Sequence, residues 1–236
     1  KHLDGSFVVN GLIKESLIKT FGIPAEKILV EPNAVDMKQF DISTPAAEAR
    51  KALSLPQDKK IVLYSGKFYD WKGLDILVKC AAALPDNYAV YFVGGDEQRL
   101  REVTGISELP SSLVCAGERP FTEMPLWQKA ADVLVLLGTK KNEYSARYTS
   151  PMKIFEYFAS GVPIVASRTE AVTQVASDSN TLLYEPDDME DLKKKIIDAA
   201  ENPEAMNGRV INALQEAHKR SWNSRAQRIM GYMESK

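Results

Sequence analysis

The chain has 236 residues, of which 44% are hydrophobic and 26% charged, and its formal net charge is −2. This composition is typical of a globular protein, and the near-neutral charge provides no basic field that would attract a nucleic-acid backbone. No apolar run approaches the roughly 18 residues that a membrane span requires, and the first residues do not resemble a signal peptide.

Short apolar runs alternate along the chain with segments of helical apolar spacing. The predicted strands are Ser6–Asn10, Lys27–Glu31, Lys60–Ser65, Ala89–Gly94, Leu113–Ala116, Val133–Leu137, Pro163–Ala166 and Thr181–Tyr184. The helical segments between them include Lys72–Ala83, Glu97–Val103, Glu123–Ala130 and Pro151–Ser160, and three further helices are predicted over Met189–Glu201, Pro203–Lys219 and Ser221–Met233. A short helix is also expected between Pro45 and Pro56.

This alternation predicts an α/β fold, a Rossmann-like parallel sheet with helices on both faces and a helical C-terminus. Runs such as Ile61-Val62-Leu63 do not alternate with polar residues, which suits strands covered on both sides. We divide the chain into an interdomain segment with a first strand and helix (1–24), a Rossmann-like domain (25–220) and a C-terminal helix (221–236).

One candidate anion site follows the strand Lys60–Ser65. Gly66 lets the backbone turn closely, and Lys67 and Lys72 flank a loop ahead of a helix. A diphosphate requires such close backbone approach and fixed positive charge. The loop is not a P-loop, because Trp71 stands where a glycine would precede the lysine. The alternative is that both lysines are solvated loop charges.

A second candidate site begins at Ser150-Pro151, which is a helix start with serine as the N-cap and proline at the first position. The exposed N–H groups of such a start form an anion seat. Glu156 follows Lys153 by three residues and could accept hydrogen bonds from the vicinal hydroxyls of a ribose. The alternative is a simple surface pair between Lys153 and Glu156.

Other loops after predicted strands are weaker candidates. Gly94, in Val93-Gly94-Gly95-Asp96, permits close approach of a ligand or forms a plain turn, and Glu118 and Arg119 lie in a loop that borders a base or is simply a connection. The polar loop Gly138–Tyr148 is a candidate sugar contact, and for Asn33–Asp36 we favour a structural turn.

Metal and cofactor chemistry finds no support in the sequence. The only histidines are His2 and His218, near the ends, and the two cysteines, Cys80 and Cys115, lie far apart in apolar segments. We therefore predict no metal, no cofactor and reduced core cysteines, as in a cytoplasmic protein.

Together these segments resemble glycosyltransferase family 4, retaining enzymes of the GT-B fold. The resemblance rests on Asn33–Phe40 (similar to "NGVD…F"), Gly66-Lys67 with Lys72-Gly73 ("GR…KG"), Val93-Gly94-Gly95 and Ala131-Asp132-Val133. Its strongest part is Ser150–Ser167, which is similar to "P…K…FEYMA.G.PVVAS". The resemblance covers nearly the whole chain, and the segments are specific only in combination.

The resemblance implies a role for each site residue. Gly66, Lys67 and Lys72 would bind the donor diphosphate, and Glu156 would hold the ribose. Gly94, Glu118 and Arg119 would border the base. The backbone of Ser150, Pro151, Met152, Lys153 and Ile154 would meet the phosphates and the sugar. The family usually has a second glutamate eight residues before the ribose-binding one, and Tyr148 stands there in this chain. Arg147, Tyr148, Ser150 or Lys153 would then contact the sugar instead.

The resemblance therefore implies transfer of a hexose, with retention, from a nucleoside-diphosphate sugar to an acceptor such as a glycan or a lipid-linked sugar. The chain starts abruptly at Lys1, without methionine, and resembles the carboxyl-terminal half of such an enzyme. The acceptor-binding domain would be missing, the fragment would be inactive alone, and the full-length enzyme would associate peripherally with the inner face of the membrane. The alternatives are a non-catalytic nucleotide-sugar-binding module and a nucleotide-sugar epimerase.

Overall fold

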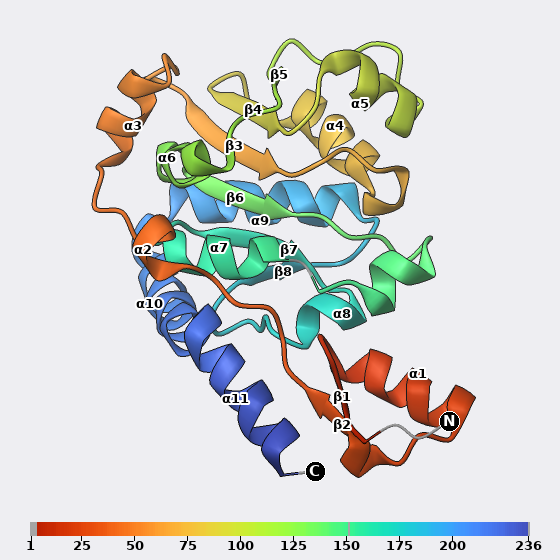
Figure 1. The fold of residues 1–236 in the computed structure, drawn as a ribbon. Coiled ribbons are helices and arrows are strands. Elements are labelled where there is room, and N and C mark those ends of the chain that lie inside the picture. Colours follow the sequence, from red (N-terminus) through yellow and green to blue (C-terminus); the bar gives the residue numbers. More distant parts are fainter. Residues whose placement is uncertain (1–3, 151, 236) are drawn as a thin grey trace.

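The computed structural model describes residues 4–150 and 152–235. Within them, six parallel strands form one sheet in the order β5-β4-β3-β6-β7-β8 (Figure 1). These strands are β3 (Lys60–Ser65), β4 (Tyr88–Val93), β5 (Leu113–Gly117), β6 (Val133–Leu136), β7 (Ile164–Ser167) and β8 (Leu182–Tyr184). The predicted fold class is confirmed, because helices cover both faces of this parallel sheet and the chain ends in helices.

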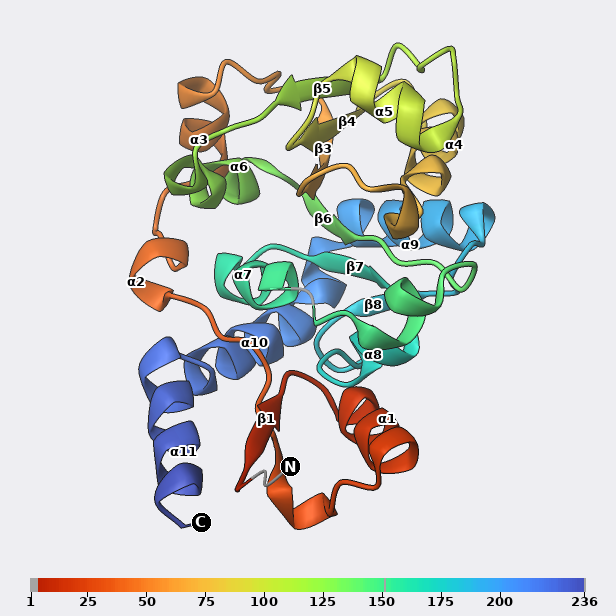
Figure 2. The same ribbon diagram turned by 45° about the vertical axis from the view of Figure 1, so that its right-hand side comes forward.

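The helices lie in two layers (Figures 1 and 2). One core lies under α2 (Met37–Phe40), α3 (Ala46–Ala52), α6 (Met124–Ala130) and α7 (Met152–Ser160), and α10 (Pro203–Lys219) packs against α7. The other lies under α4 (Leu74–Ala83), α5 (Glu97–Thr104) and α9 (Met189–Glu201). All six residues of β4 are buried, which explains why its sequence does not alternate between apolar and polar residues.

Two of the predicted strands belong to a separate small sheet. β1 (Ser6–Val8) and β2 (Ile28–Val30) pair only with each other, in parallel. In the sequence, α1 (Gly11–Phe21) lies between these two strands. Of the eight predicted strands, six therefore belong to the main sheet and two to the small sheet. Local patterns identified the strands, but strand partners are set by contacts between distant segments.

The C-terminal helix α11 (Trp222–Glu234) docks against this small unit and so joins the two ends of the chain (Figure 1). The Arg228 guanidinium donates to both carboxylate oxygens of Glu31, at 2.7–3.1 Å, and Arg225 donates to the carbonyl of Pro32. Glu31 is only 5% exposed, so the paired arginine compensates the burial of its charge.

Most of the other predicted element bounds agree with the structure to within two residues. α3 confirms the short helix expected between the prolines, whereas α8 (Glu170–Thr173) and the π-helical turn η4 (Tyr144–Tyr148) were not predicted. Both are too short to show a periodicity.

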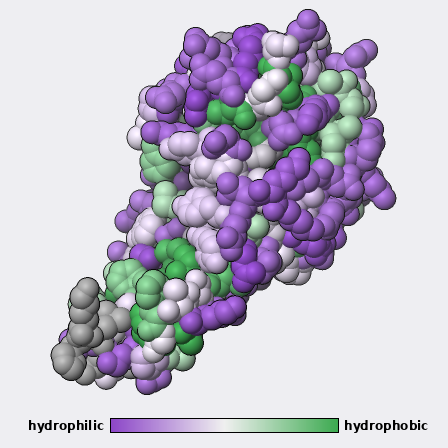
Figure 3. Space-filling view, turned by 90° about the vertical axis from the view of Figure 1, so that its right-hand side faces the viewer, coloured by the Kyte–Doolittle hydropathy of each residue, from purple (hydrophilic) through white to green (hydrophobic). Residues whose placement is uncertain are grey.

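Hydrophobic side chains remain exposed near both ends of the chain. Figure 3 looks onto the edge where the strands end, and hydrophobic residues are visible in the narrow lower part of the molecule. Phe7 and Phe21 of the small unit are exposed, as are Trp222, Met230 and Met233 of α11. No helix within the described ranges has the length and apolarity to cross a membrane.

The carboxyl ends of the strands form one edge, where ligands bind in open parallel sheets. The sheet order reverses between β3 and β6, the neighbours from which the chain runs outward in opposite directions. Gly66 and Gly94 follow β3 and β4 directly, and both have a positive φ. Their backbones lie so close together that a Cβ at Gly94 would be 2.4 Å from the carbonyl oxygen of Gly66. Glycine at this position lets the two loops approach each other this closely.

We expect Gly94→Ala to lower the free energy of unfolding by about 2–4 kcal/mol, because alanine at φ +125° is strained and its methyl overlaps backbone. The control is Gly208→Ala in α10, where the added methyl meets nothing within 4 Å. There, helix propensity should raise stability by about 0.5–1 kcal/mol. Urea unfolding measures both, and equal stabilities for the two variants would contradict this close approach.

Candidate functional site

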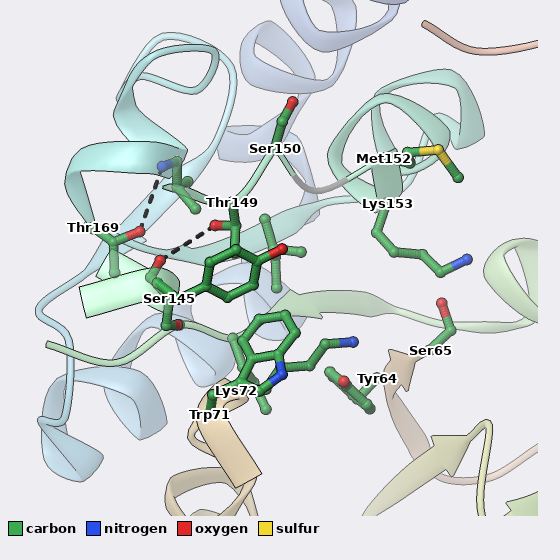
Figure 4. A pocket seen from close by; sticks show the side chains of 15 residues that line it. Tyr64, Ser65, Trp71, Lys72, Ser145, Thr149, Ser150, Met152, Lys153 and Thr169 are labelled. Atoms are coloured by element: carbon green, nitrogen blue, oxygen red, sulfur yellow. Dashed lines mark hydrogen bonds between the residues drawn. The ribbon is translucent and has the colours of Figure 1, made fainter. Parts of the chain in front are cut away.

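A cavity of about 270 Å³ opens at the reversal point of the sheet (Figure 4). β3 contributes Tyr64 and Ser65, and the loop after it contributes Trp71 and Lys72. The remaining lining residues come from the end of β6 and the segment after it, from the start of α7 and from the region of α8: Leu136, Leu137, Gly138, Tyr144, Ser145, Thr149, Ser150, Met152, Lys153, Thr169 and Val172. The two candidate anion sites of the sequence therefore meet at one cavity, through Lys72 from the first and Ser150 and Lys153 from the second.

Lys72 is held inside this cavity by its own loop. Its Nζ donates to the carbonyl oxygen of Lys67 at 3.1 Å and lies 5.2 Å and 5.5 Å from the ring centres of Tyr69 and Trp71. Burial, and secondarily the positive charge of Lys153, lower the pKa of Lys72 to about 8. Two cations that repel each other across a cavity are stabilised by an anion between them.

Lys153 and Glu156 lie on consecutive turns of α7. The Lys153 ammonium donates to Oε2 of Glu156 at 2.9 Å and stands 5.7 Å from the centre of the Phe121 ring. Glu156 is 3% exposed and lines a smaller cavity of about 210 Å³ together with Phe121 and Met152. Lys153 and Glu156 do form the ion pair that we considered as an alternative to a ribose contact, but the Glu156 carboxylate is buried and does not lie on the surface.

A groove continues from the main cavity toward β4 and β5. Lys72 and Lys153 line both the main cavity and a neighbouring one of about 340 Å³, which also contains Gly66, Lys67, Gly94, Glu118, Arg119 and Phe121. A third hollow shares Lys67, Gly94 and Glu118 with it. The predicted diphosphate and base residues thus line one continuous surface.

Helix α7 is tied directly to the end of β3. The Tyr157 hydroxyl accepts from the backbone N–H of Ser65 and lies 3.1 Å from Ser65 Oγ. Tyr157 is 1% exposed, so this contact is protected from water. It fixes the distance between the loop that carries Lys72 and the helix that carries Lys153.

The segment from Arg147 to Ser150, which lines the cavity, is held by two asparagines that lie more than 100 residues away in the sequence. Asn10 donates to the carbonyl oxygens of Arg147 and Thr149, at 3.1 and 3.0 Å, and Asn33 donates to the carbonyl oxygen of Ser150 at 2.9 Å. The Asn10 side chain also caps α1, since its Oδ1 accepts from the N–H of Ile13. The β1–α1–β2 unit therefore positions the wall of the site.

We expect Asn10→Asp to destabilise the protein by about 2 kcal/mol, although aspartate caps a helix as well as asparagine does. The carboxylate keeps the cap on α1 but cannot donate to the two carbonyls, which are left facing negative charge. Urea unfolding and faster amide exchange in residues 144–150 would show this effect. The matched control is Asn212→Asp, at an exposed site where one side-chain bond to Ser179 is lost, with an expected change under about 0.5 kcal/mol. Similar losses in the two variants would contradict a tether at Asn10.

Not every predicted site residue lies in these cavities. Ile154 is fully buried in the core and does not line the described cavities, so only its backbone could meet a ligand. The Tyr148 hydroxyl is directed to Glu143 at 3.3 Å. Pro151 lies outside the described residues. Asn33–Asp36 has the structural role that we favoured, since Asp36 caps α2 and Asn33 holds Ser150.

Sequence reasoning missed several residues that line or support the site. Trp71 forms an edge-to-face pair, with ring centres 5.0 Å apart, with Tyr144 of the candidate polar loop, Thr169 lies buried at the start of α8, and Asn10 acts from 137 residues away. The only available signal was position, because Trp71 precedes Lys72 and Asn10 follows the first strand. Among the described residues, no group of three or more histidine, cysteine, aspartate or glutamate side chains is placed to hold a metal.

The fold and the site define a Rossmann-like α/β domain with a cationic cavity at the carboxyl-terminal edge of its sheet. The family model "Glycosyl transferases group 1" matches residues 46–216. The chain therefore belongs to this glycosyltransferase family, in agreement with the resemblance found in the sequence.

Relatives in the same family cover most of this chain but are much longer. A D-inositol 3-phosphate glycosyltransferase of Xylanimonas cellulosilytica is 29% identical over 189 residues, which is 74% of this chain and 43% of the relative. An uncharacterized glycosyltransferase of Methanocaldococcus jannaschii is 26% identical over 75% of this chain and 48% of its own length. The chain thus spans about half the length of these relatives.

Solved structures of other proteins have the same fold. Sucrose-phosphate synthase from Thermosynechococcus elongatus superimposes with a TM-score of 0.79 at 23% identity, covering 99% of this chain and 59% of that structure. The Anabaena protein HepE, solved in complex with UDP-glucose, superimposes with a TM-score of 0.80 at 20% identity, over 99% of this chain and 64% of HepE.

Proposed function

We propose that this chain is the donor-binding half of a retaining hexosyltransferase that uses a nucleoside-diphosphate sugar. The observation that carries the proposal is the convergence of Lys72 and Lys153 on one cavity at the reversal point of the sheet. Negative charge grows on the diphosphate as the glycosidic bond to it breaks. Two fixed ammonium groups stabilise that charge without a metal.

The nucleoside would occupy the groove beyond the two lysines. Glu156, buried beside Lys153, would accept hydrogen bonds from the ribose hydroxyls, and Gly94, Glu118 and Arg119 would border the base. Lys67, at the mouth of the groove, would contact the diphosphate together with the backbone of Gly66. Support comes from the continuity of the cavities and from HepE, whose fold is shared and which was solved with UDP-glucose.

The acceptor would bind to a further domain of the same polypeptide. This proposal is supported by the relatives, of whose length this chain covers about half. We propose a glycan or lipid-linked acceptor, a cytoplasmic location, and peripheral contact of the full-length enzyme with the membrane. On its own the chain would bind donor and transfer nothing.

A non-catalytic nucleotide-sugar-binding module is a second candidate, favoured by one observation. Tyr148 stands where the family usually has a glutamate, and its hydroxyl is directed to Glu143. Incubation of the full-length protein with donor and acceptor, with release of nucleoside diphosphate as the readout, separates the two functions. Turnover above the background rate of donor hydrolysis excludes the non-catalytic binding function.

The proposal is tested by calorimetric titration of this chain with UDP, GDP and ADP. We expect one of the three to bind with a dissociation constant in the micromolar range, and its nucleoside monophosphate to bind more weakly because it lacks one phosphate. If none of the diphosphates binds at millimolar concentration, the assignment as a donor-binding domain is wrong.

Binding of that diphosphate should weaken as the pH rises through about 8. The free protein loses the Lys72 ammonium in this range, whereas the bound diphosphate favours the charged form and raises the pKa again. The affinity is therefore complete below about pH 7 and falls above pH 8, by up to about tenfold per pH unit. Lys72→Arg stays charged throughout, so its affinity should be flat from pH 7 to 9.5. Parallel profiles for the two proteins would contradict a diphosphate contact by Lys72.

A further inference from the structure

The part of the main cavity beyond the two ammonium groups has mostly apolar walls. Tyr64, Leu136, Leu137 and Val172 line it from the sheet and from α8, and Trp71, Tyr144 and Met152 line it from the loops and α7. Trp71 is fixed between two rings, since it stacks on Tyr69 at 5.6 Å and meets Tyr144 edge-on at 5.0 Å. If the proposed function holds, the transferred sugar occupies this part of the cavity.

Three of the hydroxyl groups here already make a hydrogen bond within the protein. Ser145 Oγ accepts from the N–H of Thr139 at 3.1 Å, Thr149 Oγ1 donates to the carbonyl of Ser145, and Thr169 Oγ1 caps α8 (Figure 4). Among the described lining residues none is acidic, and Tyr148 replaces the carboxylate that the family usually supplies. Among the described lining residues the cavity therefore offers sugar hydroxyls no carboxylate, and three of its neutral hydroxyl acceptors are already engaged in one hydrogen bond each.

Apolar walls without a carboxylate acceptor discriminate between sugars. A hydroxyl that leaves water for an apolar wall without a partner is disfavoured, whereas a methyl group in the same place is favoured. An unsubstituted hexose brings several hydroxyls to the cavity. A hexose in which an acetamido group or a deoxy position replaces one of them presents a methyl group to the walls.

We propose that the transferred sugar is a hexose bearing such a methyl group, as a 2-acetamido or a 6-deoxy sugar does, in preference to an unsubstituted hexose. This inference rests on the proposed function, because it takes the main cavity as the sugar site. Trp71, Met152 and Val172 would be its specificity-determining residues.

The test compares matched donors that differ at one position. This chain is titrated with UDP-glucose against UDP-N-acetylglucosamine, dTDP-glucose against dTDP-6-deoxyglucose, and GDP-mannose against GDP-6-deoxymannose, with each free diphosphate as the baseline. In at least one pair we expect the methyl-bearing donor to bind at least tenfold more tightly than its partner. If free diphosphates bind but no pair shows a preference for the methyl-bearing donor, the inference is wrong and the proposed function stands. If no diphosphate binds, both are wrong.

A variant then links the preference to the cavity wall. Met152→Gln keeps the side-chain length and adds an amide, so it should reduce the preference at least threefold. The preference is the ratio of two donor affinities measured on the same variant, so a general change in diphosphate binding cancels from it. Met230→Gln on α11 is the matched control, since Met230 is also exposed but lines none of the described cavities. An unchanged preference in Met152→Gln would contradict the assignment of this wall to the sugar.

Discussion

In the full-length enzyme, Lys72→Ala should lower kcat by about 10²–10³, which corresponds to roughly 3–4 kcal/mol of transition-state stabilisation. The ammonium lies in the cavity beside Lys153, and burial strengthens its attraction for an anion. Substrate binding should weaken less than turnover, because the charge on the diphosphate grows only as the bond to the sugar breaks. Steady-state kinetics with saturating acceptor measure both quantities.

The control for this variant is Lys79→Ala. Lys79 lies on α4 and pairs with Asp75 at 2.8 Å, with 57% of its side chain exposed, so its removal should leave turnover within twofold. Lys72→Arg should recover part of the activity, because it restores charge but not the compact ammonium geometry. If Lys72→Ala retains activity within about threefold of wild type, Lys72 does not stabilise the leaving diphosphate.

The second large effect is expected for Glu156→Gln, which should weaken binding of the nucleoside diphosphate by about 10- to 100-fold. A buried carboxylate that accepts from hydroxyl groups is worth about 1.5–3 kcal/mol more than a neutral or missing partner. Glu156 is 3% exposed and its Oε2 accepts from Lys153, which fixes its orientation. Calorimetric titration measures the loss.

A deoxynucleotide distinguishes a ribose contact from a structural effect. Wild-type protein should bind the 2′-deoxy and 3′-deoxy forms of the diphosphate more weakly than the ribose form, whereas Glu156→Gln should discriminate little between them. Glu102→Gln, which changes only exposed contacts with Arg99 and Gln98, should behave as wild type. If Glu156→Gln keeps the full ribose preference, the Glu156 carboxylate pairs with Lys153 and does not contact the ribose.

Much of the site could be predicted from local sequence because its elements carry local signals. The exit of β3 at Gly66 and the start of α7 after Ser150 are marked by turn and cap residues, and both contribute to one cavity in the structure. The topology rule for parallel sheets places such strand ends at a common edge. The order of elements therefore sufficed to group Lys67, Lys72 and Lys153, and Glu156 adjoins this group through its bond to Lys153.

The sequence alone determined the α/β class, most strands and helices, and the family, because periodicity, caps and glycines act over a few residues. Only the tertiary structure decided which strands pair, so that β1 and β2 form their own sheet. It also showed that Asn10 holds the carbonyls of Arg147 and Thr149, that Trp71 meets Tyr144, and that burial lowers the pKa of Lys72. These properties depend on contacts between segments far apart in the chain, and no local pattern in the sequence specifies such contacts.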